Sequence, residues 1–134
     1  MEAKGGRILL LEDHADTARA FSMLLAQDGF HVTLAGTLEE ALKVCADGTF
    51  DLLVCDVQLH DGNGISMLQA ARKHCPDVRG IVVTGYDEPE QREAARQAGF
   101  LEYLVKPLTY ADLHAAVDRA MAPPGPVEPT PMIG

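Results

Sequence analysis

The sequence is short of basic residues. Lys and Arg together number 11 against 20 Asp and Glu, which gives a formal net charge of −9 at pH 7. Proteins that bind nucleic acid hold the phosphate backbone with clustered Lys and Arg, so we expect no direct contact with nucleic acid. The same charge disfavours docking on anionic lipid, but it leaves open a protein partner with a basic surface.

Long apolar runs are also missing. A membrane-spanning helix needs roughly 18 or more predominantly apolar residues in succession, and the chain contains no such stretch. Residues 1–6 are polar and lack the apolar centre of a signal peptide. We therefore expect no association with a membrane and a location in the cytoplasm.

Cysteine is scarce, and its positions form no metal-binding pattern. Cys45, Cys55 and Cys75 lie far apart, with no CxxC pair and no matching histidines, so a zinc site is not expected. Cys55 falls inside an apolar run and Cys45 on the apolar face of an expected helix. These positions are typical of small buried hydrophobic residues in a reducing compartment.

What the chain does contain is a regular alternation of apolar runs and helical patterns. At 134 residues, of which 47% are hydrophobic, it is expected to form one domain with a single core. Apolar runs predict strands, the first of them buried on both faces, at residues 7–11, 31–35, 52–56, 79–84 and 102–105. Apolar residues at helical spacing predict helices at residues 15–28, 37–48, 65–74, 88–98 and 109–121. The second of these helices opens with a capping-box pattern at residues 37–40.

The spacing of apolar residues also predicts which side chains of each helix face the core. In chain order, the expected inward residues are Ala18, Phe21, Leu24 and Leu25, then Leu38, Ala41, Leu42 and Cys45, then Leu68 and Ala71, and finally Leu113, Ala116, Val117 and Ala120. In the helix at residues 88–98, the candidate inward residues are mostly alanines. Because it has little apolar area to bury, it is a candidate for mobility or for a partner surface.

The composition changes near the C-terminus. Residues 122–134 contain five prolines and few large apolar groups, which predicts a disordered tail or the stump of a linker. The expected organisation is an N-terminal extension at residues 1–6, one folded domain at residues 7–121 and this tail.

Five strand–helix pairs in succession predict an α/β fold of the (βα)5 type. With right-handed crossovers, they form a doubly wound five-stranded parallel sheet of strand order 2-1-3-4-5. In that order the first and third strands are neighbours. Open α/β sheets bind ligands at the carboxyl ends of their strands, so the residues at those ends are the candidates for function.

Four of the expected strands end in polar groups. Glu12 and Asp13 follow the first strand and Asp56 ends the third; Thr84 ends the fourth and Lys106 follows the fifth. The strand order brings the three carboxylates together, where they repel one another unless a divalent cation such as Mg²⁺ relieves the repulsion. An alternative is that these acids only cap the neighbouring helix and loop.

Each of the remaining candidate residues, taken alone, is weaker evidence for a functional site. Lys106 beside an acidic pocket would be a counter-ion for a carboxylate or a phosphate, and its bond to Pro107 is a candidate for the cis form. His14 and His60 also lie near the strand ends. A metal-ligand or phosphoacceptor role is open to these histidines, although surface and loop histidines without a function are commoner.

Taken as a set, these residues resemble the receiver domain of two-component response regulators. The resemblance covers residues 7 to about 121. The residues that carry it are Leu11-Glu12-Asp13, Asp56 with Gly64 eight positions later, Thr84-Gly85, and Tyr103-Leu104-Val105-Lys106-Pro107.

The resemblance implies a phosphoacceptor and a metal site. Asp56 would accept a phosphoryl group from a phosphohistidine. Glu12, Asp13 and Asp56 would bind Mg²⁺ together with the backbone carbonyl of Gln58, with Mn²⁺ as the other candidate ion. The domain would catalyse only its own phosphorylation and dephosphorylation, and so would not be an enzyme in the usual sense.

The resemblance also assigns roles around the phosphate. Thr84 and Lys106 would contact phosphoryl oxygens, and Tyr103 would be the aromatic switch residue. Gln58 and Tyr86 occupy positions that tune the lifetime of the phosphate. The small residue Gly85 leaves access open, and His60 departs from the proline found there in many receivers.

The implied partners are a sensor histidine kinase or a phosphotransfer protein as donor, and an unidentified downstream protein. A homodimer is a further option. It would form through the face made of residues 88–98, 102–105 and 109–121. A stand-alone regulator, a phosphorelay intermediate and a receiver excised from a hybrid sensor histidine kinase all remain open.

Three readings of another kind are disfavoured. A flavin-binding electron carrier would need a Ser/Thr/Gly-rich loop after the first strand, and none is there. An aspartyl phosphatase would need a second acid two residues after its nucleophile, where this chain has Gln58. A scaffold that binds partners without phosphate would have no use for so complete a pocket.

Overall fold

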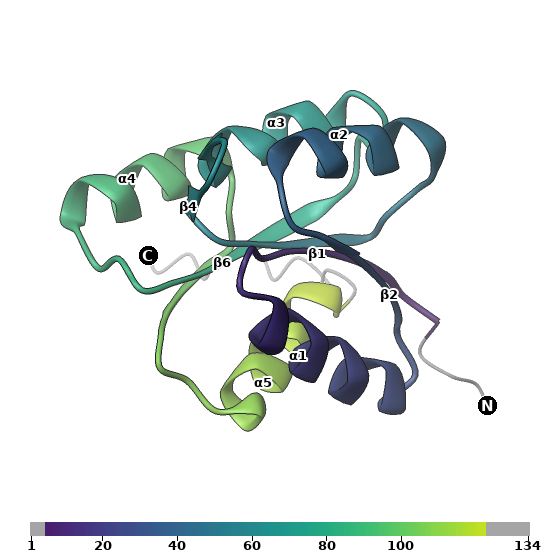
Figure 1. The fold of residues 1–134 in the computed structure, drawn as a ribbon. Coiled ribbons are helices and arrows are strands. Elements are labelled where there is room, and N and C mark those ends of the chain that lie inside the picture. The colour runs from purple at the N-terminus through teal and green to yellow at the C-terminus, as the bar shows by residue number, and fades with distance from the viewer. Residues whose placement is uncertain (1–4, 123–134) are drawn as a thin grey trace, which may run out of the picture.

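The computed structural model describes residues 5–122, which form a parallel sheet covered by helices on both faces (Figure 1). The sheet has five strands in the order β2-β1-β3-β6-β7, which confirms the predicted topology. The strands are β1 (Arg7–Leu11), β2 (His31–Ala35), β3 (Leu52–Cys55), β6 (Arg79–Thr84) and β7 (Glu102–Val105). Residues 1–4 and 123–134, and with them almost all of the expected tail, lie outside the described residues.

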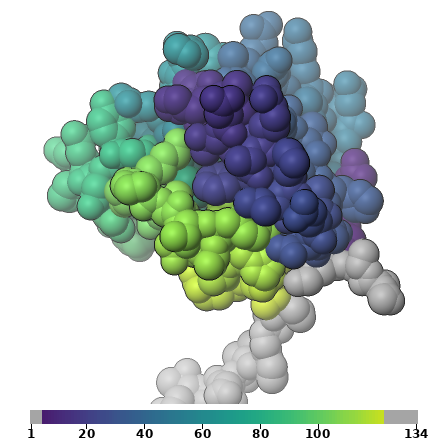
Figure 2. Space-filling model, turned by 60° about the horizontal axis from the view of Figure 1, so that its bottom comes forward, coloured from purple at the N-terminus to yellow at the C-terminus, as the bar shows by residue number. Residues whose placement is uncertain are grey.

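The helices divide into two layers. Helices α2 (Leu38–Asp47), α3 (Met67–Arg72) and α4 (Pro89–Ala98) lie above the sheet in Figure 1, and α1 (Ala15–Gln27) and α5 (Tyr110–Met121) lie below it. Figure 2 views the lower face, where α1 and α5 lie side by side. Among residues 5–122, no helix is both long enough and apolar enough to cross a membrane.

The central strands separate two hydrophobic clusters. Leu9 and Leu11 of β1 pack on the α2–α3–α4 side, whereas Ile8 and Leu10 pack on the α1–α5 side. All four are at most 3% exposed, so β1 is buried on both faces, as its continuous apolar run predicts. The three cysteines are buried and free, as expected, and burial, with the nearby Cys75, raises the pKa of Cys45 to about 11.

The inward faces of the helices were predicted correctly with two exceptions. All four predicted residues of α5 are buried. Leu24 of α1 and Leu42 of α2, in contrast, are 36% and 45% exposed. Each is the immediate neighbour of a buried residue, Leu25 or Ala41. Successive residues on a helix point about 100° apart, so the neighbour of a buried residue at the edge of the apolar stripe can be exposed.

The segment after β3 differs most from prediction. The expected loop at residues 62–64 contains part of a short antiparallel hairpin, β4 (Gln58–Leu59) paired with β5 (Gly62–Asn63). The expected helix at residues 65–74 is a 3-10 turn, Gly64–Ser66, followed by the shorter α3. Two-residue strands are too short to show an alternating pattern, so the sequence gives no signal for them.

The start of α2 is capped from two parts of the chain. The hydroxyl oxygen of Thr37 accepts a hydrogen bond from Glu40 N, which is one half of the predicted capping box. The other half is missing because the Glu40 carboxylate accepts from Gly36 N instead. Asp61, in the β4–β5 turn, accepts from the backbone N–H groups of Leu38 and Glu39 at 2.9 and 3.1 Å. The hairpin is thereby tied to α2.

Helix α4 is attached by little apolar surface. Ala95 is its single buried residue, as its alanine-rich sequence predicts. Its C-terminus ends at Gly99, whose φ of 102° lies in the left-handed region that favours glycine. Each of the other described α-helices buries two to four residues, so α4 is the one least held by packing.

Gly80 in β6 offers a test of how tightly the sheet packs. A Cβ at Gly80 would lie 2.7 Å from Phe100 and 3.1 Å from Leu68. Gly80→Ala is therefore expected to lower the free energy of unfolding by about 1–3 kcal/mol through overpacking. Urea denaturation measures this change.

Gly85→Ala is the matched control, because a Cβ there would meet nothing within 4 Å. It is expected to unfold close to the wild-type midpoint. Equal midpoints for the two variants would contradict close packing of β6 against Phe100.

Candidate functional site

The polar residues at the strand ends meet in one pocket at the carboxyl edge of the sheet. Its lining comes from the segments that follow β1, β3, β6 and β7 and includes Asp13, His14, Asp56, Gln58, His60, Asn63, Thr84, Gly85, Tyr86 and Lys106. Of the residues predicted for the site, Glu12 and Tyr103 are not part of this lining. The predicted strand ends therefore converge as the topology requires.

The acidic group is positioned by the pairing of β1 with β3. Leu11 and Cys55 are register partners in these strands, so the residues that follow them, Glu12 and Asp56, emerge side by side. Asp56 N donates to Leu11 O at 3.1 Å, and Glu12 N donates to Ala35 O at 3.0 Å. The carboxylates of Glu12 and Asp56 are buried, each residue being 5% exposed.

Lys106 compensates these two buried charges. Its ammonium lies 2.7 Å from Glu12 Oε1 and 3.1 Å from Asp56 Oδ2. Burial by itself lowers the pKa of Lys106, but the hydrogen bond to Glu12 and the negative charges of Asp56 and Glu12 outweigh it, and the pKa is raised. The peptide bond between Lys106 and Pro107 is cis, which confirms the form considered from the sequence.

The carboxylates differ in how well they are satisfied. Both Glu12 oxygens have partners, because Oε2 accepts from His14 N at 3.0 Å and contacts His14 Nδ1 at 2.9 Å. Asp13 Oδ1, in contrast, is buried and accepts no hydrogen bond from any residue between 5 and 122. His14 Nδ1 lies 3.4 Å from this oxygen. A buried carboxylate oxygen without a partner is costly, and a bound cation would remove that cost.

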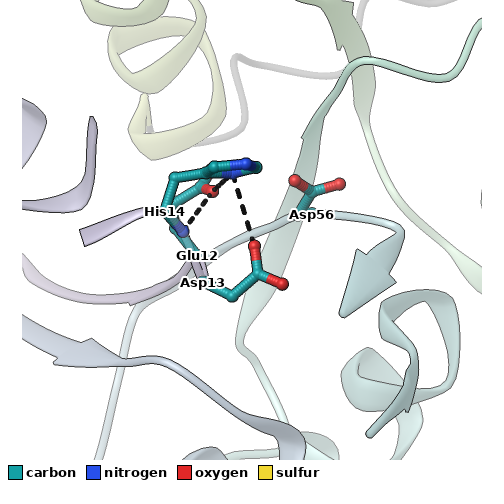
Figure 3. A group of neighbouring side chains, drawn as sticks. All are labelled: Glu12, Asp13, His14 and Asp56. Atoms are coloured by element: carbon teal, nitrogen blue, oxygen red, sulfur yellow. Dashed lines mark hydrogen bonds and ion pairs between the residues drawn. The ribbon is translucent and has the colours of Figure 1, made fainter. Parts of the chain in front are cut away.

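A cation has suitable ligands here. Oxygen and nitrogen atoms of Glu12, Asp13, His14 and Asp56 lie within 4.8 Å of one another (Figure 3). Carboxylate oxygens are the ligands that hard divalent ions prefer.

The alternative in which the acids only cap a helix finds no support at α1, whose start has no side-chain cap. Asp56 Oδ1 does accept from Gln58 N at 3.2 Å, so it also organises its own loop.

Gly64 closes the loop behind Asp56. A Cβ at this position would lie 1.9 Å from Asp56 O and 2.5 Å from Cys55 Sγ, so the chain can pass here only as glycine. Gly64 N donates to Val57 O at 2.8 Å, and the Cys55 thiol donates to Gly64 O. The presence of glycine at position 64, one of the residues that carry the family resemblance, thus has a steric explanation.

Thr84 and its neighbours form the other wall of the pocket. Thr84 is 1% exposed, and its hydroxyl oxygen accepts from Tyr86 N at 3.3 Å. The Tyr86 hydroxyl accepts a short hydrogen bond from the Gln58 side chain, which joins the loops after β3 and β6. Gly85, between them, has open space where a side chain would be.

Tyr103 connects this wall to α4. Its hydroxyl donates to Tyr86 O at 2.6 Å, and its half-buried ring packs against the cluster on the α2–α3–α4 side. The guanidinium of Arg92 lies 4.8 Å from the ring centroid and also pairs with Asp87. Burial raises the pKa of Tyr103. Arg92 was not predicted, since no sequence pattern relates this helix residue to a ring 11 positions away.

The two histidines noted from the sequence flank Asp13. His14 is the N-cap residue of α1, and His60 lies at the turn of the β4–β5 hairpin, with its Nε2 3.8 Å from Asp13 Oδ2. Their side chains are 73% and 82% exposed. They therefore stand at the mouth of the pocket, one on each side of Asp13.

Comparison with known proteins places this geometry in a family. The family model for the response regulator receiver domain matches residues 8–118. The chain is 31% identical over 115 residues to the transcriptional regulatory protein ZraR of Escherichia coli strain K12. It is 32% identical over 118 residues to the alginate biosynthesis transcriptional regulatory protein AlgB of Pseudomonas aeruginosa. These matches cover 86% and 88% of this chain but 26% of each relative, so the chain spans about a quarter of their length.

Solved structures of receiver domains are similar to this fold. A CheY-like receiver domain protein from Methanospirillum hungatei has a TM-score of 0.83 at 29% identity, covering 88% of this chain and 94% of that one. The non-phosphorylated HemR receiver domain from Leptospira biflexa has a TM-score of 0.82 at 28% identity, covering 90% and 98%. A response regulator from Burkholderia pseudomallei, solved with a phosphorylated aspartic acid, a calcium ion and citrate, has a TM-score of 0.78 at 28% identity, covering 83% and 65%.

The family match extends over nearly all the described residues and includes the pocket at the carboxyl edge of the sheet. The chain belongs to the response regulator receiver domains of two-component signalling systems.

Proposed function

We propose that Asp56 accepts a phosphoryl group from a phosphohistidine and that this modification switches a protein-binding face. The donor is a sensor histidine kinase or a phosphotransfer protein. The observation that carries the proposal is the buried contact of Lys106 with both Glu12 and Asp56, beside an Asp13 oxygen that has no hydrogen-bond partner. The phosphorylated aspartic acid and calcium ion of the Burkholderia pseudomallei relative support the same reading.

The residues fit a divalent cation. Mg²⁺ is the proposed ion, with Mn²⁺ as the alternative, and its ligands are carboxylate oxygens of Glu12, Asp13 and Asp56 and the backbone carbonyl of Gln58. Asp13 offers the oxygen that is free to bind it. When bound, such an ion neutralises negative charge on the carboxylates and on the phosphoryl group.

The phosphoryl transfer follows from this arrangement. A carboxylate oxygen of Asp56 attacks phosphorus in line with the bond to the donor imidazole nitrogen. The new O–P bond forms as the N–P bond breaks, and the electron pair of that bond stays with the imidazole. Lys106 is placed to neutralise charge on the phosphoryl oxygens. The protein's part is thus positioning and electrostatic stabilisation, and water later hydrolyses the acyl phosphate.

The switch begins at Thr84. Its hydroxyl, with Lys106, would contact phosphoryl oxygens, and movement of Thr84 toward the phosphate would stretch the bond that its oxygen now accepts from Tyr86 N. A movement of Tyr86 alters the carbonyl to which the Tyr103 hydroxyl donates. Tyr103 in turn lies beneath Arg92 of α4. Phosphorylation is therefore proposed to shift the population of the face formed by α4, β7 and α5.

The downstream partner is proposed as a protein that recognises this face. The relatives ZraR and AlgB are transcriptional regulatory proteins of which the chain covers about a quarter. Control of transcription through a linked domain, a stand-alone role, a place in a phosphorelay and a role within a hybrid kinase are the candidate outputs. A homodimer through the same face is compatible with each of them.

Phosphorylation of Asp56 is tested by intact mass after incubation with acetyl phosphate and Mg²⁺. The wild type is expected to gain a single phosphate, which Asp56→Asn and chelation of the metal both abolish. Asp77→Asn, which changes an exposed carboxylate, is the control and should be modified like the wild type. Absence of any adduct on folded wild-type protein would sink the phosphoacceptor role.

Asp13→Asn tests the cation site through stability. Replacing a buried carboxylate oxygen that lacks a partner by a neutral amide is expected to raise the unfolding free energy of the metal-free protein by about 1 kcal/mol. The same change should remove the stabilisation that Mg²⁺ gives the wild type. Thermal unfolding with Mg²⁺ and with chelator measures both, and Mg²⁺ stabilisation that survives the substitution would refute the assignment.

Tyr86→Phe tests the lifetime of the phosphate. It removes the hydroxyl that joins Tyr86 to Gln58, so water should reach the acyl phosphate more easily. A hydrogen bond of about 1 kcal/mol corresponds to about fivefold faster dephosphorylation. Tyr110→Phe removes a hydroxyl bonded to Asp28 between α5 and α1 and should leave the rate unchanged. A phosphate that lasts as long in Tyr86→Phe as in the wild type counts against this role.

A further inference from the structure

Two imidazole rings stand beside the same carboxylate at the mouth of the pocket. His14 Nδ1 is 3.4 Å from Asp13 Oδ1, and His60 Nε2 is 3.8 Å from Asp13 Oδ2. Figure 3 shows the His14 ring lying over the carboxylates, with contacts to both Glu12 and Asp13. Each oxygen of Asp13 therefore faces a ring nitrogen, and the ring nearer the buried oxygen belongs to His14.

His14 belongs to the group that can share one ion. Between residues 5 and 122, Glu12, Asp13, His14 and Asp56 form the only set of three or more His, Cys, Asp or Glu side chains whose ligand atoms lie within 4.8 Å of one another. Metal–nitrogen and metal–oxygen bonds in proteins measure about 2.0–2.2 Å. One ion between these atoms is within reach after small side-chain movements.

The His14 ring can make such a movement without loss of its anchor. Its backbone N–H is held by Glu12 Oε2 at 3.0 Å, and its carbonyl accepts from Ala18 N at 2.9 Å at the start of α1. Glu12 keeps that backbone bond and its contact with Lys106 if the ring turns away from it. In the contact with Glu12 Oε2, Nδ1 serves as the N–H donor, so binding an ion requires the other tautomer, which has its proton on Nε2 and its lone pair on Nδ1.

We propose that His14 Nδ1 is a metal ligand and makes this pocket favour borderline transition-metal ions, such as Co²⁺ and Ni²⁺, over Mg²⁺. This inference rests on the proposed cation site and specifies its selectivity. Mg²⁺ takes oxygen ligands and gives up its water reluctantly, whereas imidazole is a preferred ligand of Co²⁺, Ni²⁺ and Cu²⁺. His60 Nε2, 3.8 Å from the second oxygen of Asp13, is placed to help orient that carboxylate for the ion.

The test is a comparison of two ions on the same variants. Co²⁺ binding is followed by its visible absorption, which changes when a nitrogen ligand is replaced by water, and Mg²⁺ binding is followed by calorimetry. His14→Ala is expected to weaken Co²⁺ at least tenfold and to shift its absorption spectrum, while Mg²⁺ affinity stays within twofold. Unchanged Mg²⁺ affinity also shows that the variant has a folded pocket.

His31→Ala is the matched control. His31 is also exposed but lies at the opposite end of the sheet, at the start of β2, and its loss should leave both ions unaffected. His60→Ala is expected to weaken Co²⁺ by a smaller factor than His14→Ala, since it acts through Asp13.

Several results would overturn the proposal. Co²⁺ affinity and spectrum that survive His14→Ala show that His14 is no ligand. Equal weakening of Co²⁺ and Mg²⁺ shows that the ring only positions Glu12. Failure of the proposed function looks different, because then Asp13→Asn would leave Mg²⁺ binding unchanged or the wild type would bind neither ion.

Discussion

The structure depends on a balance of charge at the carboxyl edge of the sheet. Glu12 and Asp56 are buried, and without a counter-ion such a pair would strongly oppose folding. Lys106 supplies that counter-ion from 94 and 50 residues away in the sequence. Three strands, β1, β3 and β7, must therefore be in place before these charges are compensated. The site and the sheet are specified together.

Compensation of the buried charges by Lys106 depends on the register of the sheet. A slip of one residue turns every side chain of a strand to the other face, so Asp56 would leave the pocket and Cys55 would take its place. The continuous burial of Leu52–Cys55 does not itself choose between the two registers, because both faces of β3 are apolar. The polar residues at the strand ends do choose, since a single register lets Lys106 reach both carboxylates.

The features that the sequence predicted follow from repeated or strongly patterned signals. Alternation of strands and helices gave the topology, and polar residues at strand ends gave Glu12, Asp13, Asp56, Thr84 and Lys106. What could not be predicted depends on contacts without a local pattern. The β4–β5 hairpin has two residues per strand, and Arg92 reaches Tyr103 only once α4 is packed beside β7. The predictions that Leu24 and Leu42 face the core were wrong. In sequence, a hydrophobic residue next to the buried stripe cannot be told from one within it.

Fold and chemistry are separable in this chain. The receiver fold is shared with relatives and solved structures from several organisms, so it says little about what distinguishes this protein. The residues around the acidic cluster lie one step outward, in the loops that the sheet positions. His14 and His60 border the acidic cluster, the side chains of Tyr86 and Gln58 join the loops after β6 and β3, and Arg92 of α4 lies over the ring of Tyr103. Because these side chains are mostly exposed, they can change at little cost to stability, whereas Glu12, Asp56 and Lys106 are held by their mutual charges. Under the proposed function, the choice of ion, the lifetime of the phosphate and the movement of α4 would therefore vary separately on a fixed scaffold.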